Sequence, residues 1–148
     1  MPTLTSKDYL LAKAVADQLT TLLTGQIVEL VGDPRVDRED LVVLVVRVRP
    51  AAWRQEPSTR AYDIDRREVH IGIVGPCDPT DTYAIDAALA LCDTVRALWG
   101  QGGALRNKVL AGHQPMGQLA QEPLWDDRTL LGNELFVGTI TVTYAGSS

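Results

Sequence analysis

The stretch at residues 135–144 constrains the fold of this chain more than any other. Apolar and polar side chains alternate along it. One face of the extended chain is apolar and consists of Phe136, Ile140, Val142 and Tyr144. The opposite face is mostly threonine and consists of Val137, Thr139, Thr141 and Thr143. This period of two is typical of a half-buried strand, which needs strand neighbours and an apolar layer over one face.

Two amphipathic helices are predicted to supply that layer. The first spans residues 8–23 after an N-cap at Thr5 or Ser6, and apolar residues recur along it at helical spacing. The second follows Asp78, which is predicted as its N-cap, and ends at Trp99. The final strand can therefore pack its apolar face under two helices.

Three earlier segments have the β-branched composition of strands, namely residues 26–31, 41–49 and 62–74. Residues 118–124 are predicted as a short strand or an extended segment. Pro50 is expected to end the second strand. A bulge near Arg66 and Arg67 is expected in the third, because Ile64 has the opposite parity from the apolar residues that follow it.

Between these strands, residues 51–61 have no periodicity and are predicted as a loop, which makes residues 50–68 a projecting loop or arm. The chain of 148 residues is expected to form a single domain with a flexible tail at residues 145–148. The order of elements predicts an α+β fold. Its sheet is mainly antiparallel or mixed, with about four strands, and two principal helices pack on one face.

The sequence contains no convincing catalytic, cofactor-binding or metal-binding motif, and none is predicted. Cys77 precedes the second helix, where a helix N-terminus lowers a thiol pKa, and His70 or His113 could serve as its base. Cys77 is therefore interpreted either as the nucleophile of a small cytoplasmic enzyme or as a small residue in a turn. His113 stands in a Gly/Pro loop and is expected to be exposed.

Charge and hydropathy limit the classes of partner. The formal net charge of −5 argues against non-specific binding to nucleic acid or to an anionic membrane. The longest uninterrupted apolar run, residues 41–46, is too short to span a bilayer, and the first residues lack the pattern of a secretory signal. We expect a protein that folds in a cytoplasm and has protein partners.

Basic residues gather around the second and third strands. Six arginines and one tryptophan form this group: Arg47, Arg49, Trp53, Arg54, Arg60, Arg66 and Arg67. Arginine and tryptophan are enriched at protein interfaces, so the group is interpreted either as a solvated arm or as an assembly surface. Thr139 and Thr141, on the polar face of the final strand, are further interface candidates.

The whole layout resembles the tail-terminator and head-tail joining proteins of long-tailed bacteriophages, including the minor tail proteins that end the tail tube. Five segments carry the resemblance: residues 8–23, 41–50, 62–74, 84–99 and the ending from 122–125 to 135–144. It covers nearly the full chain and is one of layout and strand endings.

The resemblance implies a structural virion protein that is not an enzyme and has no cofactor. Such proteins form a homo-hexameric ring at the head-proximal end of the tail, stop the polymerisation of the tail tube and join the tail to the head connector. The implied partners are other copies of the chain, the major tail tube protein and the head connector or stopper protein. DNA would pass through the lumen without specific binding, and no membrane is involved.

The implied location is the tail or neck of the virion, after folding in the host cytoplasm. Another neck protein, concerned with head completion or tail completion, is the alternative within this class.

Overall fold

The computed structural model describes residues 3–32, 41–57 and 63–147. Within these ranges the elements in chain order are α1 (Lys7–Leu22), β1 (Ile27–Leu30), β2 (Val45–Pro57), β3 (Asp63–Pro76), α2 (Thr82–Ala97), β4 (Gln114–Ala120), α3 (Asp127–Asn133) and β5 (Leu135–Ser147). The α+β class is confirmed. The described residues form three helices and five strands, where two principal helices and about four strands were expected.

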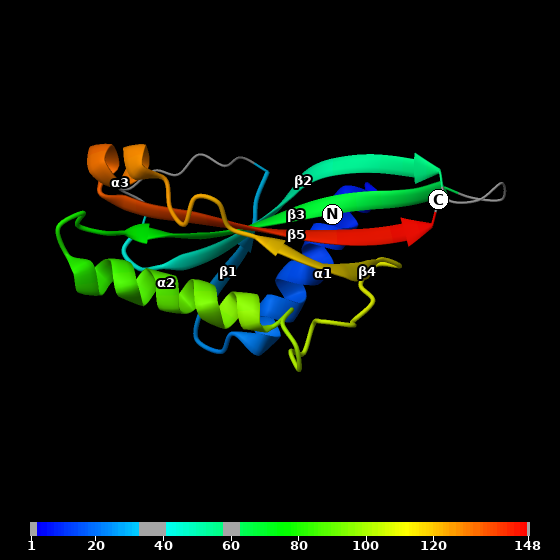
Figure 1. Cartoon of the computed structure of the whole chain (residues 1–148), viewed down its shortest axis with the longest axis horizontal. Coiled ribbons are helices and arrows are strands. Elements are labelled where there is room, and N and C mark those ends of the chain that lie inside the picture. Colours follow the sequence, from blue (N-terminus) through cyan, green and yellow to red (C-terminus); the bar gives the residue numbers. More distant parts are fainter. Residues whose placement is uncertain (1–2, 33–40, 58–62, 148) are drawn as a thin grey trace.

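The strands form one mixed sheet in the order β1-β2-β3-β5-β4 (Figure 1). β1 pairs in parallel with β2, and all other neighbours are antiparallel. β4 begins at Gln114 and ends at Ala120, so it overlaps the predicted segment at residues 118–124 only over residues 118–120. Its sequence pattern is weak because Pro115 and Gly117, which has φ 72°, interrupt its pairing with β5.

Both α1 and α2 pack on the same face of the sheet, as the sequence predicts. Their buried side chains, including Leu11 and Cys92, belong to one apolar core with the inward side chains of β2, β3 and β5. On β5 the inward residues are those of the predicted apolar face, and each is at most 1% exposed: Phe136, Ile140, Val142 and Tyr144. Within this core the Trp99 indole Nε1 donates a hydrogen bond of 2.8 Å to the Tyr144 hydroxyl. The two faces of the final strand are therefore predicted correctly.

The helix N-caps are partly as predicted. Ser6, one of the two expected candidates, caps α1 by accepting a hydrogen bond from the backbone N–H of Tyr9. For α2 the predicted cap, Asp78, is wrong. Asp78 accepts hydrogen bonds from Thr80 in the preceding turn, and Asp81 caps the helix. Either aspartate precedes the same apolar stripe, so periodicity alone does not choose between them.

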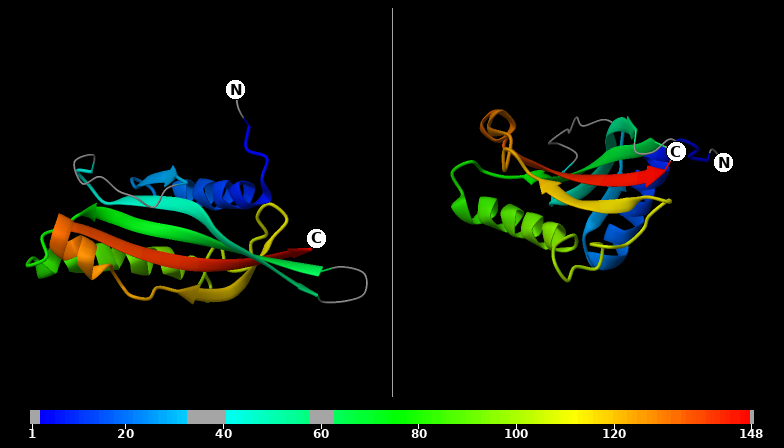
Figure 2. Two further views of the ribbon diagram at one scale, coloured as in Figure 1. Left: turned by 90° about the horizontal axis from the view of Figure 1, so that it is seen from above. Right: turned by 45° about the vertical axis from the view of Figure 1, so that its right-hand side comes forward.

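Beyond the helices the sheet continues as an arm, which comprises residues 52–57 of β2, 63–68 of β3 and 145–147 of β5 (Figures 1 and 2). The predicted loop at residues 51–61 is therefore wrong for residues 51–57, and Pro50 does not end the strand. In the described residues, β1 pairs with β2 only as far as Val48, so Pro50 lies where β2 is already an edge strand. A proline without an N–H is tolerated there.

Two smaller predictions about the arm also fail. The bulge lies in β2, between Pro50 and Ala52, and β3 is regular through Arg66 and Arg67. The side chain of Ile64 lies on the other face of β3 from the later apolar residues. It points away from the helices, and its neighbour on β2 is Glu56. Residues 145–147, expected as a flexible tail, extend β5 along β3. Among the described helices, none is both long and apolar enough to cross a membrane.

Candidate functional site

The face of the sheet opposite the helices brings together four of the predicted interface residues. Arg47 and Thr139 lie in one row on either side of Gly72, and Arg49 and Thr141 lie in the next row on either side of His70. All four side chains are half-buried by their neighbours in the sheet. We call this surface the open face, defined by the outward residues Arg47, Arg49, His70, Thr139 and Thr141.

Most arginines on this side are already paired within the chain. Arg47 lies 3.4 Å from Glu29 on β1. On the arm, Glu56 contacts two arginines, with Arg66 at 2.9 Å and Arg54 at 3.2 Å. The Arg54 side chain is 70% exposed, so this pair contributes little to stability and leaves the guanidinium accessible. Arg60 lies outside the described residues.

The prediction that Arg67 is a surface residue is wrong. Its side chain is 9% exposed and faces the helices, in the same parity as Val69 and Ile71. Arg67 Nε lies 3.0 Å from Asp8 at the start of α1, and its Nη1 lies 3.4 Å from the buried Asp65. Gln55 on β2 donates to the other oxygen of Asp65 at 3.2 Å. Asp65 and Arg67, in the charged segment of β3, therefore form a buried ion pair and are not part of a solvated strand face.

His113 completes this cluster, and its expected exposure is also wrong, since it is 6% exposed. Its Nε2 lies 3.1 Å from Arg67 Nη1, and its Nδ1 lies 2.8 Å from the carbonyl oxygen of Ala111. A guanidinium can only donate, so Nε2 accepts and the proton resides on Nδ1. The ring packs closely on β5, since a Cβ at Gly146 would lie 2.8 Å from His113 Cδ2. We call Asp8, Gln55, Asp65, Arg67 and His113 the joint, because they tie α1 and the loop before β4 to the arm.

Trp53 is at the surface, as predicted, on the edge of the arm. It is 54% exposed and, with Tyr9 and residues 50–52, borders a hollow of about 370 Å³ next to the start of α1. Trp53 points to the helix side of the sheet, and Arg54, the next residue, points to the open side. The edge of the arm thus presents an aromatic and a cationic side chain in succession.

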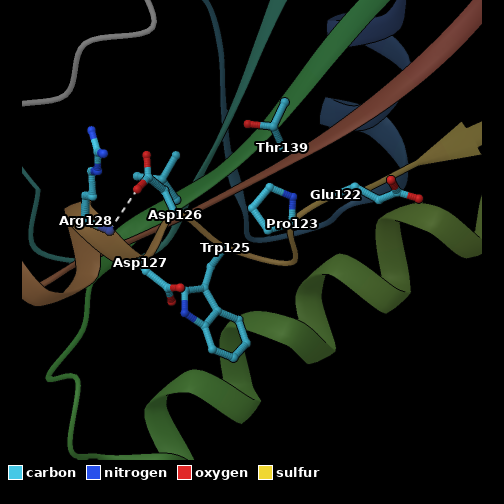
Figure 3. A pocket seen from close by; sticks show the side chains of 8 residues that line it. Glu122, Pro123, Trp125, Asp126, Asp127, Arg128 and Thr139 are labelled. Carbon is cyan, nitrogen blue, oxygen red and sulfur yellow. Dashed lines mark hydrogen bonds between the residues drawn. The ribbon is translucent and has the colours of Figure 1, made fainter.

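A second hollow, of about 490 Å³, lies beside β5 and α3 (Figure 3), and α3 lies at the end of the sheet opposite the arm (Figure 1). We call it the end hollow. It is lined by residues of the β4–α3 connection, of α3 and of β5: Glu122, Pro123, Trp125, Asp126, Asp127, Arg128, Val137 and Thr139. Glu122 lies on one side of it, and residues 126–128 lie on the other (Figure 3). Asp126 caps α3 by accepting hydrogen bonds from the backbone N–H groups of Arg128 and Thr129.

Cys77 is not placed as a nucleophile. It is 5% exposed, and burial raises the pKa of its thiol, with Asp81 and Asp78 raising it further. His113 is held by Arg67 in the joint, and His70 lies on the open face. A catalytic thiol needs the opposite shift. The alternative of an enzyme based on Cys77 therefore loses its chemical support.

The remaining titratable group of note is His70. Burial lowers its pKa, Arg49 lowers it further, and Glu68 opposes them, so the ring is neutral at pH 7. Across the described ranges, no group of three or more histidine, cysteine, aspartate or glutamate side chains is arranged to hold a metal ion. The features with functional geometry are surfaces: the open face, the edge of the arm and the end hollow. Comparison of the chain with protein-family models and with curated proteins finds no match.

Proposed function

We propose that this chain is a structural subunit at the neck of a long-tailed bacteriophage. In this proposal, copies assemble into a hexameric ring at the head-proximal end of the tail. The ring ends polymerisation of the tail tube and joins the tail to the head connector or stopper protein. The observation that carries the proposal is the arm, a three-stranded extension of the sheet that reaches beyond both helices and is held at its base by the joint, in which Asp65, Arg67 and His113 are buried.

A rigid projection supports a role in assembly for an energetic reason. Association costs the freedom of any segment that must become ordered, and a preformed arm avoids most of that cost. The arm is built from paired strands, and the Arg67 contacts fix it to α1 and to the loop before β4. Its edge presents Trp53 and Arg54, residue types that dominate interface energies.

The charge of the chain is compatible with the proposed DNA passage. A net charge of −5 gives a duplex no general electrostatic attraction, and Arg47 and Arg66 on the outward side of the sheet each lie beside a glutamate. DNA would therefore slide through the ring without specific binding. A map of the ring with unpaired arginines along the lumen would contradict this part of the proposal.

The proposal is tested with the purified chain and the tail-tube subunit encoded in the same genome. Native mass spectrometry should give a hexamer, either alone or on the end of preformed tubes. Addition of the chain to polymerising tube subunits should stop elongation, which electron microscopy measures as tube length, with tube subunits alone as the control. A chain that stays monomeric with tubes present and leaves tube length unchanged would refute it.

A further inference from the structure

We infer that the arm of one copy docks into the end hollow of the next copy, with Trp53 and Arg54 as the anchoring side chains. This inference rests on the proposed ring and identifies the two surfaces that would close it. The occupant of the end hollow is thus a second copy of this chain.

The positions of the two surfaces determine the type of contact. The end hollow adjoins α3, and α3 and the free end of the β2–β3 hairpin lie at opposite ends of the sheet (Figure 1). One copy therefore cannot bring its own arm to its own hollow. A contact between different surfaces of identical copies is head-to-tail, and such contacts close into a ring when the rotation between neighbours permits.

The chemistry of the end hollow suits a cationic aromatic segment. Three carboxylates line it, Glu122, Asp126 and Asp127, against the single guanidinium of Arg128. Asp126 is used as the cap of α3, whereas Glu122 and Asp127 form no ion pair within the described part of the chain. The hollow also has apolar walls from Pro123, Trp125 and Val137. An aromatic anchor and a guanidinium can therefore both be satisfied there.

The chemistry of the arm is complementary. Successive residues of a strand point to opposite sides, so an edge that enters a hollow offers Trp53 to one wall and Arg54 to the other. The existing partner of Arg54, Glu56, also holds Arg66, so release of Arg54 does not leave Glu56 unpaired. Pro50, Pro57 and the bulge at residues 50–52 disfavour the addition of another strand at this edge. The contact is therefore made by side chains.

Disulfide trapping tests the contact directly. A chain with Arg54→Cys is mixed with a chain with Asp127→Cys under mild oxidation, and each is also oxidised alone. The native thiols Cys77 and Cys92 are buried, so background cross-linking is low. We expect covalent dimers only in the mixture, and a ladder up to the full ring for a chain that carries both substitutions. Dimers of the Arg54→Cys chain with itself, or an unreactive mixture, would overturn the inference.

Charge reversal tests the energetics. Arg54→Glu and Asp127→Arg should each weaken assembly about tenfold or more, and the two together should recover most of it. Lys13→Glu, an exposed reversal on α1, is the matched control and should assemble normally. Circular dichroism checks that each variant is folded. If both single reversals assemble like the wild type, or if the pair does not recover, the contact is not the inferred one.

The two proposals fail in different ways. Rings that stop tail tubes without the mixed cross-link would leave the proposed function standing and remove this contact. Mixed cross-links in an oligomer that does not affect tail tubes would keep the contact and remove the proposed function.

Discussion

Replacement of Arg67 by methionine should destabilise this protein more than replacement of any other arginine in its described residues. Methionine keeps much of the length of the side chain and removes its charge and donors. The largest effect is on Asp65, whose side chain is 6% exposed and would keep only Gln55 as its described partner. Removal of one partner from a buried ion pair costs about 3–5 kcal/mol, because the other charge stays buried without compensation.

The other two contacts of Arg67 add less. Asp8 is 44% exposed and can turn to water, so its loss costs about 0–1 kcal/mol. His113 loses the donor to its Nε2, which costs about 1 kcal/mol. These losses are not additive, and a total of about 4 kcal/mol is expected, within an overall stability of about 5–15 kcal/mol. For a chain of this length, that corresponds to a drop in Tm of about 8–16 °C.

Urea unfolding followed by circular dichroism measures this loss, and Arg54→Met is the matched control. The Arg54 side chain is 70% exposed, so the same change there should cost less than about 1 kcal/mol. Asp65→Asn added to Arg67→Met should recover part of the loss, because a buried amide is less costly than a buried carboxylate. Equal effects of Arg67→Met and Arg54→Met would show that the joint does not hold the arm.

Three further predictions concern the core, the two faces of β5 and the thiols. Burial raises the pKa of Tyr144 to about 12, so the folded state keeps a proton that the unfolded state loses; stability should be full below pH 10 and fall between pH 10 and 12. Urea midpoints should show this loss in the wild type and less of it in Tyr144→Phe. Ile140→Asp should unfold the chain because that position is fully buried, whereas Thr141→Glu on the open face should leave the monomer folded. Unfolding of both variants in circular dichroism would contradict the assigned faces. Native Cys77 and Cys92 should react slowly with a thiol reagent until urea unfolds the chain, and rapid native labelling of Cys77 would restore the enzyme alternative.

The sequence predicts the body of this fold better than its arm, and burial explains the difference. Alternation reports that one face of a strand is buried, as it is for Ile140 and Val142 on β5. On β2 most residues beyond Pro50 are exposed, since the helices do not cover the arm. Where neither face of a strand is buried, apolar and polar residues need not alternate along it. Its backbone hydrogen bonds alone produce no such pattern in the sequence.

Part of the joint can be predicted from the parity of Asp65 and Arg67 along β3, although the alternating charges of this segment favour another interpretation. Asp65 and Arg67 have the same parity as Val69, Ile71 and Ile73, so they belong on the helix side of β3. Alternating charges favour a solvated or interface-paired strand and so conceal this parity. Asp8 and His113 could not be assigned to the cluster, because they lie far from Arg67 in the chain and only the folded topology brings them together.

The pairing of charges distinguishes the two candidate contact surfaces. Threonine suits a strand face that water can reach, so Thr139 and Thr141 alone do not mark an interface. On the outward side of the sheet Arg47 and Arg66 already have glutamate partners, so a neighbouring copy would gain little by supplying another carboxylate to either of them. At the end hollow, Glu122 and Asp127 line an apolar recess without such partners in the described residues. The two ends of the molecule therefore retain more unused binding capacity than its broad polar face, and this favours a ring joined end to end over stacking of open faces.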